Sequence, residues 1–260
     1  MRIAVRSGAA QSRGVETWHV LIATAGTYLL AGFIKGVIGL GLPTVAVGLL
    51  GLMMSPAQAA AILVVPSLAT NVWQCFVGGA VPELLKRLAS LLIGICVGTA
   101  IAALLLPPGG GEATIWLGAM LSLYAVLGLL KVHFKVPRRA ETWLGFIVGV
   151  GNGMLSVATS VFVIPAVPYL QSLDLDRDRL VQALGLSFTV STITLALALA
   201  HAGEMAWSLW VPSALALGTA IVGMLIGQAV RGRISPATFR LWFFLSLLAL
   251  GLHLTLRHML

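Results

Sequence analysis

Apolar residues dominate long stretches of this chain, and the stretches follow an order that occurs twice. An apolar stretch of about 20 residues is long enough to cross a bilayer as a helix. Two stretches are longer and contain glycine-rich interruptions, and each is followed by three uninterrupted ones. They are residues 18–54 (broken at 36–43), 57–78, 84–106, 113–132, 142–170 (also broken), 180–200, 208–229 and 237–256. The pattern predicts an all-α polytopic membrane protein of two repeats, each a broken helical region followed by three transmembrane helices.

The two interruptions have similar sequences. The first reads GFIKGVIGLGLPT from Gly32 to Thr44, and the second reads GFIVGVGNGMLS from Gly145 to Ser156. One interpretation is close helix packing, because small residues four positions apart let helix backbones approach each other in lipid. The other is a helix break at a binding site, because paired glycine-interrupted segments are typical of transporters built from repeats. The recurrence after 113 residues, from position 32 to position 145, favours the break.

Composition supports a membrane protein and excludes soluble classes. Hydrophobic residues make up 59% of the 260 residues, charged residues make up 9%, and the mean hydropathy is +1.02. A soluble domain of this length does not bury so much apolar surface. The net charge of +8 comes from Lys and Arg in loops, without the interleaved aromatic residues of a nucleic-acid surface. The expected surroundings are therefore a lipid bilayer, and no nucleic-acid partner is expected.

Lys and Arg in short loops favour the cytoplasmic side and so predict an orientation. The loops expected inside are 86–87, 131–139 and 231–233, and those expected outside, which lack Lys and Arg, are 107–112 and 201–206. The broken region 142–170, together with the loop 171–179, then begins and ends inside. The predicted units are an N-terminal tail (1–17), a first transmembrane repeat (18–132), a basic cytoplasmic linker (133–141) and a second transmembrane repeat (142–257).

Two arrangements of the first repeat remain open. If the region 18–54 also returns to its own side, the N-terminus lies outside and the repeats are inverted, which the shared order of elements favours. If Arg2, Arg6 and Arg13 hold the N-terminus inside, the region 18–54 crosses once and strict inversion is lost.

Polar groups within the apolar stretches are neutral or basic. All eight acidic residues fall in loops or at span ends, so no carboxylate is expected in the middle of the membrane. The polar positions that share a helix face after each broken region are Ser67, Thr70, Asn71 and Gln74, and then Ser187 and Ser191. Ser and Thr alone also serve as glue between helices, whereas amides need several partners and favour a protein-lined or wet cavity.

Hydrogen-bond donors without acids indicate a site for a small anion, with no cofactor and no metal. A broken helix leaves backbone N–H groups that attract anions, and glycines let a ligand approach them. Lys35 lies deep and supplies charge to the anion if the first region turns back within the bilayer. If the first arm spans fully, Lys35 instead snorkels to the far interface. The candidate substrate-binding residues are Lys35, Gly36, Gly39, Gly41, Thr44, Ser67, Thr70, Asn71, Gln74, Gly149, Gly151, Asn152, Gly153, Ser156, Ser187 and Ser191.

The two glycine clusters, each followed by a proline and a polar helix, resemble the sulfite exporter TauE/SafE family of membrane permeases. The resemblance implies a multi-pass carrier of the bacterial inner membrane, with sulfite or organosulfonate anions among the substrates. The chain departs from the pattern where many members have three consecutive glycines, because Leu42 follows Gly41 and Met154 follows Gly153. The residues that carry the resemblance are Gly32, Gly36, Gly39, Gly41, Pro43, the segment 66–74, Gly145, Gly149, Gly151, Gly153, Pro165 and the segment 183–187.

Two other functions remain as alternatives to a carrier. An anion channel shares these features and differs in lacking saturable counterflow. An intramembrane enzyme needs a nucleophile and a base within reach, whereas the five histidines sit at span ends or in loops, so no catalytic residues are expected. A coupling ion, proton or sodium, and an oligomer are compatible with the sequence, which specifies neither.

Overall fold

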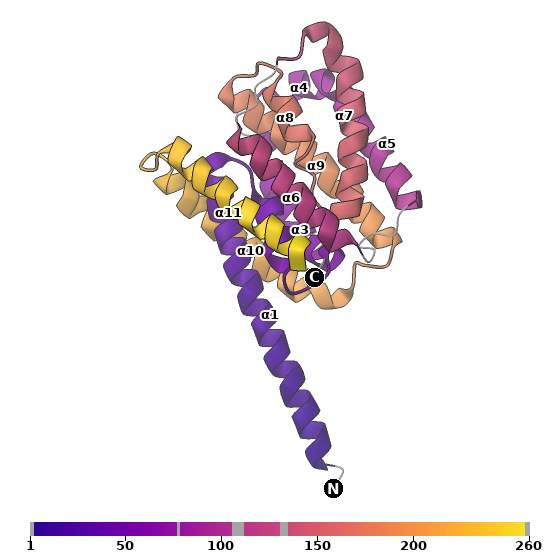
Figure 1. Ribbon diagram of the computed structural model, residues 1–260, viewed down its shortest axis with the longest axis vertical. Helices are drawn as coiled ribbons and strands as arrows, with labels where there is room; N and C mark the ends of the chain where they lie inside the picture. The colour runs from indigo at the N-terminus through magenta and orange to yellow at the C-terminus, as the bar shows by residue number, and fades with distance from the viewer. Residues whose placement is uncertain (1–2, 77–78, 106–111, 131–134, 258–260) are drawn as a thin grey trace.

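The described part of the chain is helical, as predicted. The computed structural model describes residues 3–76, 79–105, 112–130 and 135–257. Figure 1 shows α1 projecting well beyond the body that the other helices form, so residues 3–17, predicted as a tail, continue this helix. The helices are α1 Ile3–Ile38, α2 Leu42–Leu50, α3 Pro56–Phe76, α4 Val81–Arg87, α5 Ala89–Leu105, α6 Ala113–Leu129, α7 Arg138–Thr159, α8 Ala166–Gln171, α9 Arg177–His201, α10 Trp210–Val230, preceded by a short 3-10 helix Trp207–Leu209, and α11 Pro236–Arg257.

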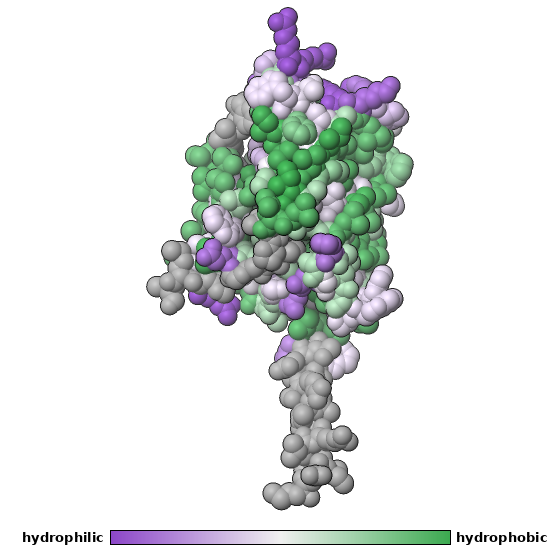
Figure 2. All heavy atoms as spheres, turned by 90° about the vertical axis from the view of Figure 1, so that its right-hand side faces the viewer, coloured by the Kyte–Doolittle hydropathy of each residue, from purple (hydrophilic) through white to green (hydrophobic). Residues whose placement is uncertain are grey.

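Six helices of the described part are long and apolar enough to cross a membrane, and in α1 the suitable part is Trp18–Ile38. Together, α4 and α5 are also long and apolar enough for one span, but the pair is bent by 63°, whereas one straight span was predicted. The helix α6 is apolar and shorter, with 17 residues. Large hydrophobic side chains are exposed on the outside of the bundle, and Figure 2 shows them below a hydrophilic upper end. The chain is a multi-pass membrane protein.

Each broken region packs against a helix from the other half of the chain. The helix α1 lies along α10, and α7 lies along α5. The helices α3 and α9 pack together, as do α6 and α11. The two halves are therefore interleaved, and the protein core lies between them.

Glycines make these contacts between the halves possible. A Cβ atom on Gly32 or Gly36 would stand 2.2 or 2.3 Å from a backbone oxygen of α10. A Cβ atom on Gly149 or Gly153 would stand 2.3 Å from a backbone oxygen of α5. Close packing, rather than breaking, is therefore the role of these four glycines. The facing helices contribute small residues of their own, which are Gly94, Gly98, Gly223 and Gly227.

The first break lies where the sequence predicts it. The helix α1 ends at Ile38, and Gly39 and Gly41 adopt φ angles of +82° and +107° before α2 begins at Leu42. Glycine adopts these left-handed conformations at little cost because it has no Cβ atom.

The second region is also broken, but the prediction that its glycine cluster forms the break was wrong. The cluster 145–156 lies inside the continuous helix α7, and the break follows at 160–165, before α8. Gly149, Gly151 and Gly153 are therefore not at a broken helix. The helix continues through this cluster because Gly149 and Gly153, as helical residues without a Cβ atom, let α7 pack closely against α5.

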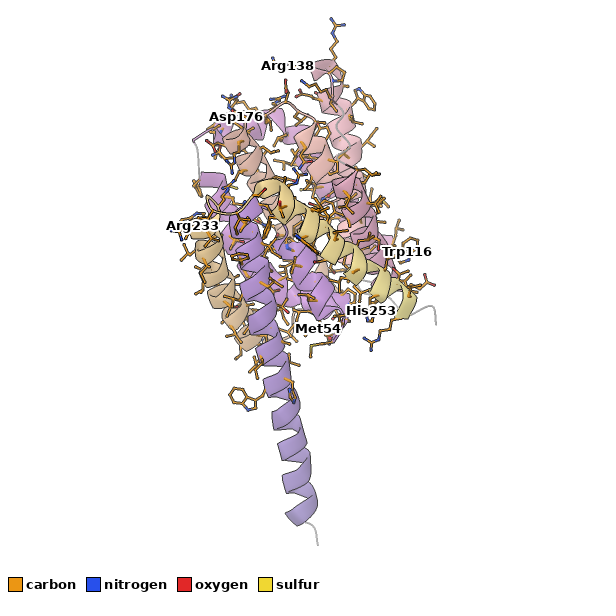
Figure 3. The ribbon with its side chains drawn as sticks, turned by 60° about the vertical axis from the view of Figure 1, so that its left-hand side comes forward. Met54, Trp116, Arg138, Asp176, Arg233 and His253 are labelled. Carbon is orange, nitrogen blue, oxygen red and sulfur yellow. The ribbon has the colours of Figure 1, made fainter. Side chains whose placement is uncertain are left out.

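The loops predicted to be cytoplasmic lie on one side of the molecule, here called the basic side. Arg138, Asp176 and Arg233 lie along this side in Figure 3, whereas Met54 and His253 lie along the opposite side. The second broken region therefore begins and ends on the same side of the molecule, as the orientation argument requires. Residues 131–134 of the linker and 106–111 of the opposite loop lie outside the described residues.

Candidate functional site

Lys35 lies on the last turn of α1, just before the first break, and it is only 3% exposed. Its ammonium group donates a hydrogen bond of 3.0 Å to Thr70 Oγ1 and another to Asn71 Oδ1, both on α3. The ammonium group is therefore buried against α3 and does not extend to the surface of the protein. The span Trp18–Ile38 is nevertheless 21 residues long, which is enough to cross the bilayer.

A chain of hydrogen bonds connects the ammonium group to the second half. Asn71 Nδ2 donates to Ser67 Oγ at 3.0 Å, and Ser67 Oγ lies 3.1 Å from Thr192 Oγ1 on α9. Thr192 donates to Phe188 O at 2.7 Å, so Ser67 is the donor in its bond with Thr192. The chain orients the oxygen of the Asn71 amide toward Lys35.

Gln74 joins the same face of α3 to the first break. Its Nε2 donates to Gly39 O at 2.8 Å, while its Oε1 is buried without a partner among the described residues. Gly39 N donates to Lys35 O at 2.7 Å, so this amide is not free for a ligand, contrary to the expectation for a broken helix. Thr44 Oγ1 donates to Gly41 O at 2.9 Å. The break is therefore held by both α3 and α2.

The second half contains a smaller polar cluster. Asn152 Nδ2 donates to Ser191 Oγ at 3.3 Å. Asn152 Oδ1 and Ser187 Oγ are buried and lack partners in the part of the chain that the structure describes. Val148 occupies the position that corresponds to Lys35 in the repeated sequence, so this cluster has no equivalent charge.

The predicted site residues fall into groups with different contacts. Those joined by hydrogen bonds beside the first break are Lys35, Gly39, Ser67, Thr70, Asn71 and Gln74. Those at close helix contacts are Gly36, Gly149 and Gly153. Those whose hydroxyl groups donate to a nearby backbone carbonyl are Thr44 and Ser156. Gly151 is apart from all of these, because a Cβ atom there would meet nothing nearer than Pro165 Cγ at 3.8 Å.

A cavity of about 260 Å³ lies on the basic side, next to the first break. Ile38 and Leu40, on either side of Gly39, form part of its wall. Its lining also includes three arginines, which are Arg177, Arg231 and Arg240. Sequence reasoning used the basic loops only for orientation and missed this site, because the arginines converge only when α9, α10 and α11 pack together.

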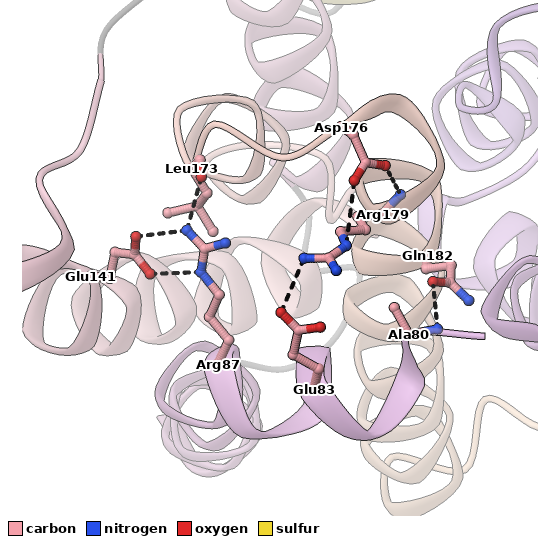
Figure 4. Close-up of polar contacts among 8 residues, drawn as sticks. All are labelled: Ala80, Glu83, Arg87, Glu141, Leu173, Asp176, Arg179 and Gln182. Atoms are coloured by element: carbon pink, nitrogen blue, oxygen red, sulfur yellow. Dashed lines mark hydrogen bonds and ion pairs between the residues drawn. The ribbon is translucent and has the colours of Figure 1, made fainter. Parts of the chain in front are cut away.

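Ion pairs connect the loops of the basic side (Figure 4). Arg87 of α4 forms a bidentate pair with Glu141 of α7, at 2.8 and 2.9 Å, and also donates to a carbonyl before α9. Arg179 pairs with Glu83 at 3.0 Å. Lys35 takes part in none of the ion pairs of the described residues. The buried ammonium group therefore has neutral partners only.

Comparison with known proteins gives one family. Residues 24–254 match the family described as sulfite exporter TauE/SafE. No curated protein and no solved structure matches significantly. The matched range contains both helix breaks, the buried lysine and the three-arginine cavity. The chain therefore belongs to the sulfite exporter TauE/SafE family of membrane transporters.

Proposed function

We propose that this protein is a secondary transporter that moves a small anion, such as sulfite or an organosulfonate, across the bacterial inner membrane. The anion binds beside the first break, where Lys35 supplies the positive charge. Thr70 and Asn71 orient the ammonium group of Lys35. Asn152, Ser187 and Ser191 add hydrogen-bonding groups from the second half. The observation that carries the proposal is the buried ammonium group of Lys35, which has hydroxyl and amide partners but no carboxylate.

A buried ammonium group without a counter-charge is costly, and this cost argues for a function. An ammonium group taken out of water without a counter-charge costs roughly several kcal/mol, even after the protein relaxes around it. Thr70 and Asn71 accept from two of the three N–H groups that an ammonium carries. An anion supplies a third acceptor and the missing negative charge. Binding is therefore favoured for an anion over a cation or a neutral solute.

The three-arginine cavity gives the anion a route toward this site. Its wall includes Ile38 and Leu40, and Lys35 lies one helical turn before Ile38. Gln74 holds the intervening Gly39 by its carbonyl oxygen. In the proposed cycle, passage from the cavity to Lys35 requires Gln74 to release this bond.

We also infer that the two halves are inverted repeats, an arrangement suited to alternating access. The helix α1 runs toward the basic side, where Ile38 lines the cavity, whereas α7 begins on that side at Arg138 and runs away from it. The exchanged contacts, α1 with α10 and α7 with α5, are what a two-fold relation between the halves produces. With the basic loops in the cytoplasm, the N-terminus then lies outside.

Counterflow in proteoliposomes tests the proposed function. Vesicles loaded with unlabelled sulfite should take up labelled sulfite in a saturable way, which a channel does not do. Lys35→Met should abolish this uptake while the purified protein keeps its elution profile. Lys86→Met removes an exposed lysine of the basic side and is the matched control, expected to retain the wild-type rate. Normal affinity and rate in Lys35→Met would refute the role of Lys35 in binding the anion. The same assay with sulfonates and carboxylates ranks the substrates.

A further inference from the structure

The cavity on the basic side is lined by three arginines that lack an ion-pair partner in the part of the chain that the structure describes. These are Arg177, Arg231 and Arg240. Arg231 Nε is buried and has no hydrogen-bond partner among the described residues. Burial and the positive charge of Arg177 lower the pKa of Arg231, while Asp178 opposes this shift. Arg177 and Arg231 therefore repel each other, and Arg231 has an unused donor group.

The rest of the cavity wall is mostly apolar. Tyr124 and Phe244 line it together with Leu180 and Leu184, and Arg240 lies over the Phe244 ring, 6.0 Å from its centroid. A volume of about 260 Å³ corresponds to roughly nine water molecules, each of about 30 Å³ in the liquid. An inorganic oxoanion would occupy only part of this space. The wall therefore suits an occupant with a charged head and an apolar body.

We propose that this cavity is a second anion-binding site, which takes an organic anion with an oxygen-rich head and a small apolar or aromatic body. The head accepts hydrogen bonds from Arg177 and Arg231, because guanidinium groups match the geometry of such heads in a bidentate way. The body contacts Tyr124 and Phe244. Arg240 adds charge at the exposed rim.

The site captures the anion on the basic side before it reaches Lys35. This role rests on the proposed transport function, because it requires an anion to move on past the first break. Binding in the cavity does not depend on that function. The two ideas can therefore fail separately.

Isothermal titration calorimetry on the purified full-length protein in neutral detergent tests the site, with benzenesulfonate as the probe. Arg231→Gln should weaken benzenesulfonate binding about tenfold or more, the effect of losing a charge-assisted hydrogen bond. Arg233→Gln, an exposed arginine of the same loop outside the cavity lining, is the matched control and should stay within about twofold. Neutral benzenesulfonamide should not bind. Equal affinities for the wild-type protein and Arg231→Gln would overturn the proposal. If Arg231→Gln aggregates, Arg240→Gln is measured in its place.

Two further arms separate the possible occupants and the two sites. Lys35→Met should lose transport but keep the component of benzenesulfonate binding that Arg231→Gln removes. Loss of binding in Lys35→Met, with binding retained in Arg231→Gln, would overturn the cavity site and leave the proposed function standing. The protein should bind benzenesulfonate with the same affinity in nanodiscs that contain phosphatidylglycerol as in nanodiscs of phosphatidylcholine. Arg231-dependent displacement by phosphatidylglycerol would show that a lipid head group occupies the cavity and would overturn the proposal.

Discussion

The contact between α7 and α5 can be tested by comparing two glycines of one helix. An alanine at position 149 would place its Cβ atom 2.3 Å from Leu91 O, while one at position 151 would meet only Pro165 Cγ, at 3.8 Å. Real Cβ atoms essentially never come within 3.0 Å of another heavy atom. The two helices would therefore have to separate by roughly 0.7 Å, the difference between 3.0 and 2.3 Å, to accommodate Gly149→Ala.

The comparison isolates the packing term in the free energy of unfolding. Both substitutions replace a helical glycine by alanine, and each gains about 0.5–1 kcal/mol of helix propensity. This gain cancels between the variants. The remaining difference is the cost of overpacking, about 1–3 kcal/mol, which affects Gly149→Ala alone. Gly151→Ala should be as stable as the wild-type protein or slightly more stable.

Equilibrium unfolding in detergent, followed by tryptophan fluorescence and circular dichroism, measures this difference, and counterflow is recorded on the same preparations. Equal stability of Gly149→Ala and Gly151→Ala would refute the close contact between α7 and α5. A Gly151→Ala protein that is stable but cannot transport would instead show that the second glycine cluster approaches the substrate. Wild-type transport by Gly151→Ala is the result expected from the structure.

Two other predictions concern orientation and the polar face of α3. Lys135 and Asp174 have exposed side chains on the basic side. Single cysteines at these positions should resist an impermeant thiol reagent in intact cells and react in inverted membranes. Labelling of position 174 from outside would reverse the topology of the second repeat. Asn71→Leu and Gln74→Leu should each abolish counterflow in a protein that still folds, because Asn71 bonds to Lys35 and Gln74 holds Gly39. Normal counterflow in both variants would mean that these amides only join helices.

Local patterns were sufficient for the class of protein and for most helix positions. Apolar length sets which segments can cross a bilayer, and every backbone polar group in lipid must be satisfied within the segment, so long apolar stretches form helices. The first break was also readable, because Gly39, Gly41 and Pro43 lie close together where a helix is hard to continue. The spacing of Ser67, Asn71 and Gln74 correctly predicted a shared buried face, since residues three and four apart lie on the same side of a helix.

Contacts between distant segments decided the features that local patterns left ambiguous. A glycine that breaks a helix and a glycine that admits a neighbouring helix look alike in sequence, and only the backbone of α5 opposite Gly149 and Gly153 distinguishes them. The burial of Lys35 depends on Thr70 and Asn71, which lie 35 and 36 residues further along the chain. The arginine cavity likewise requires the starts of α9 and α11 and the end of α10 to meet. Apolarity places segments in the membrane, but it does not specify their neighbours, because lipid and apolar side chains are almost equally good surroundings for an apolar helix.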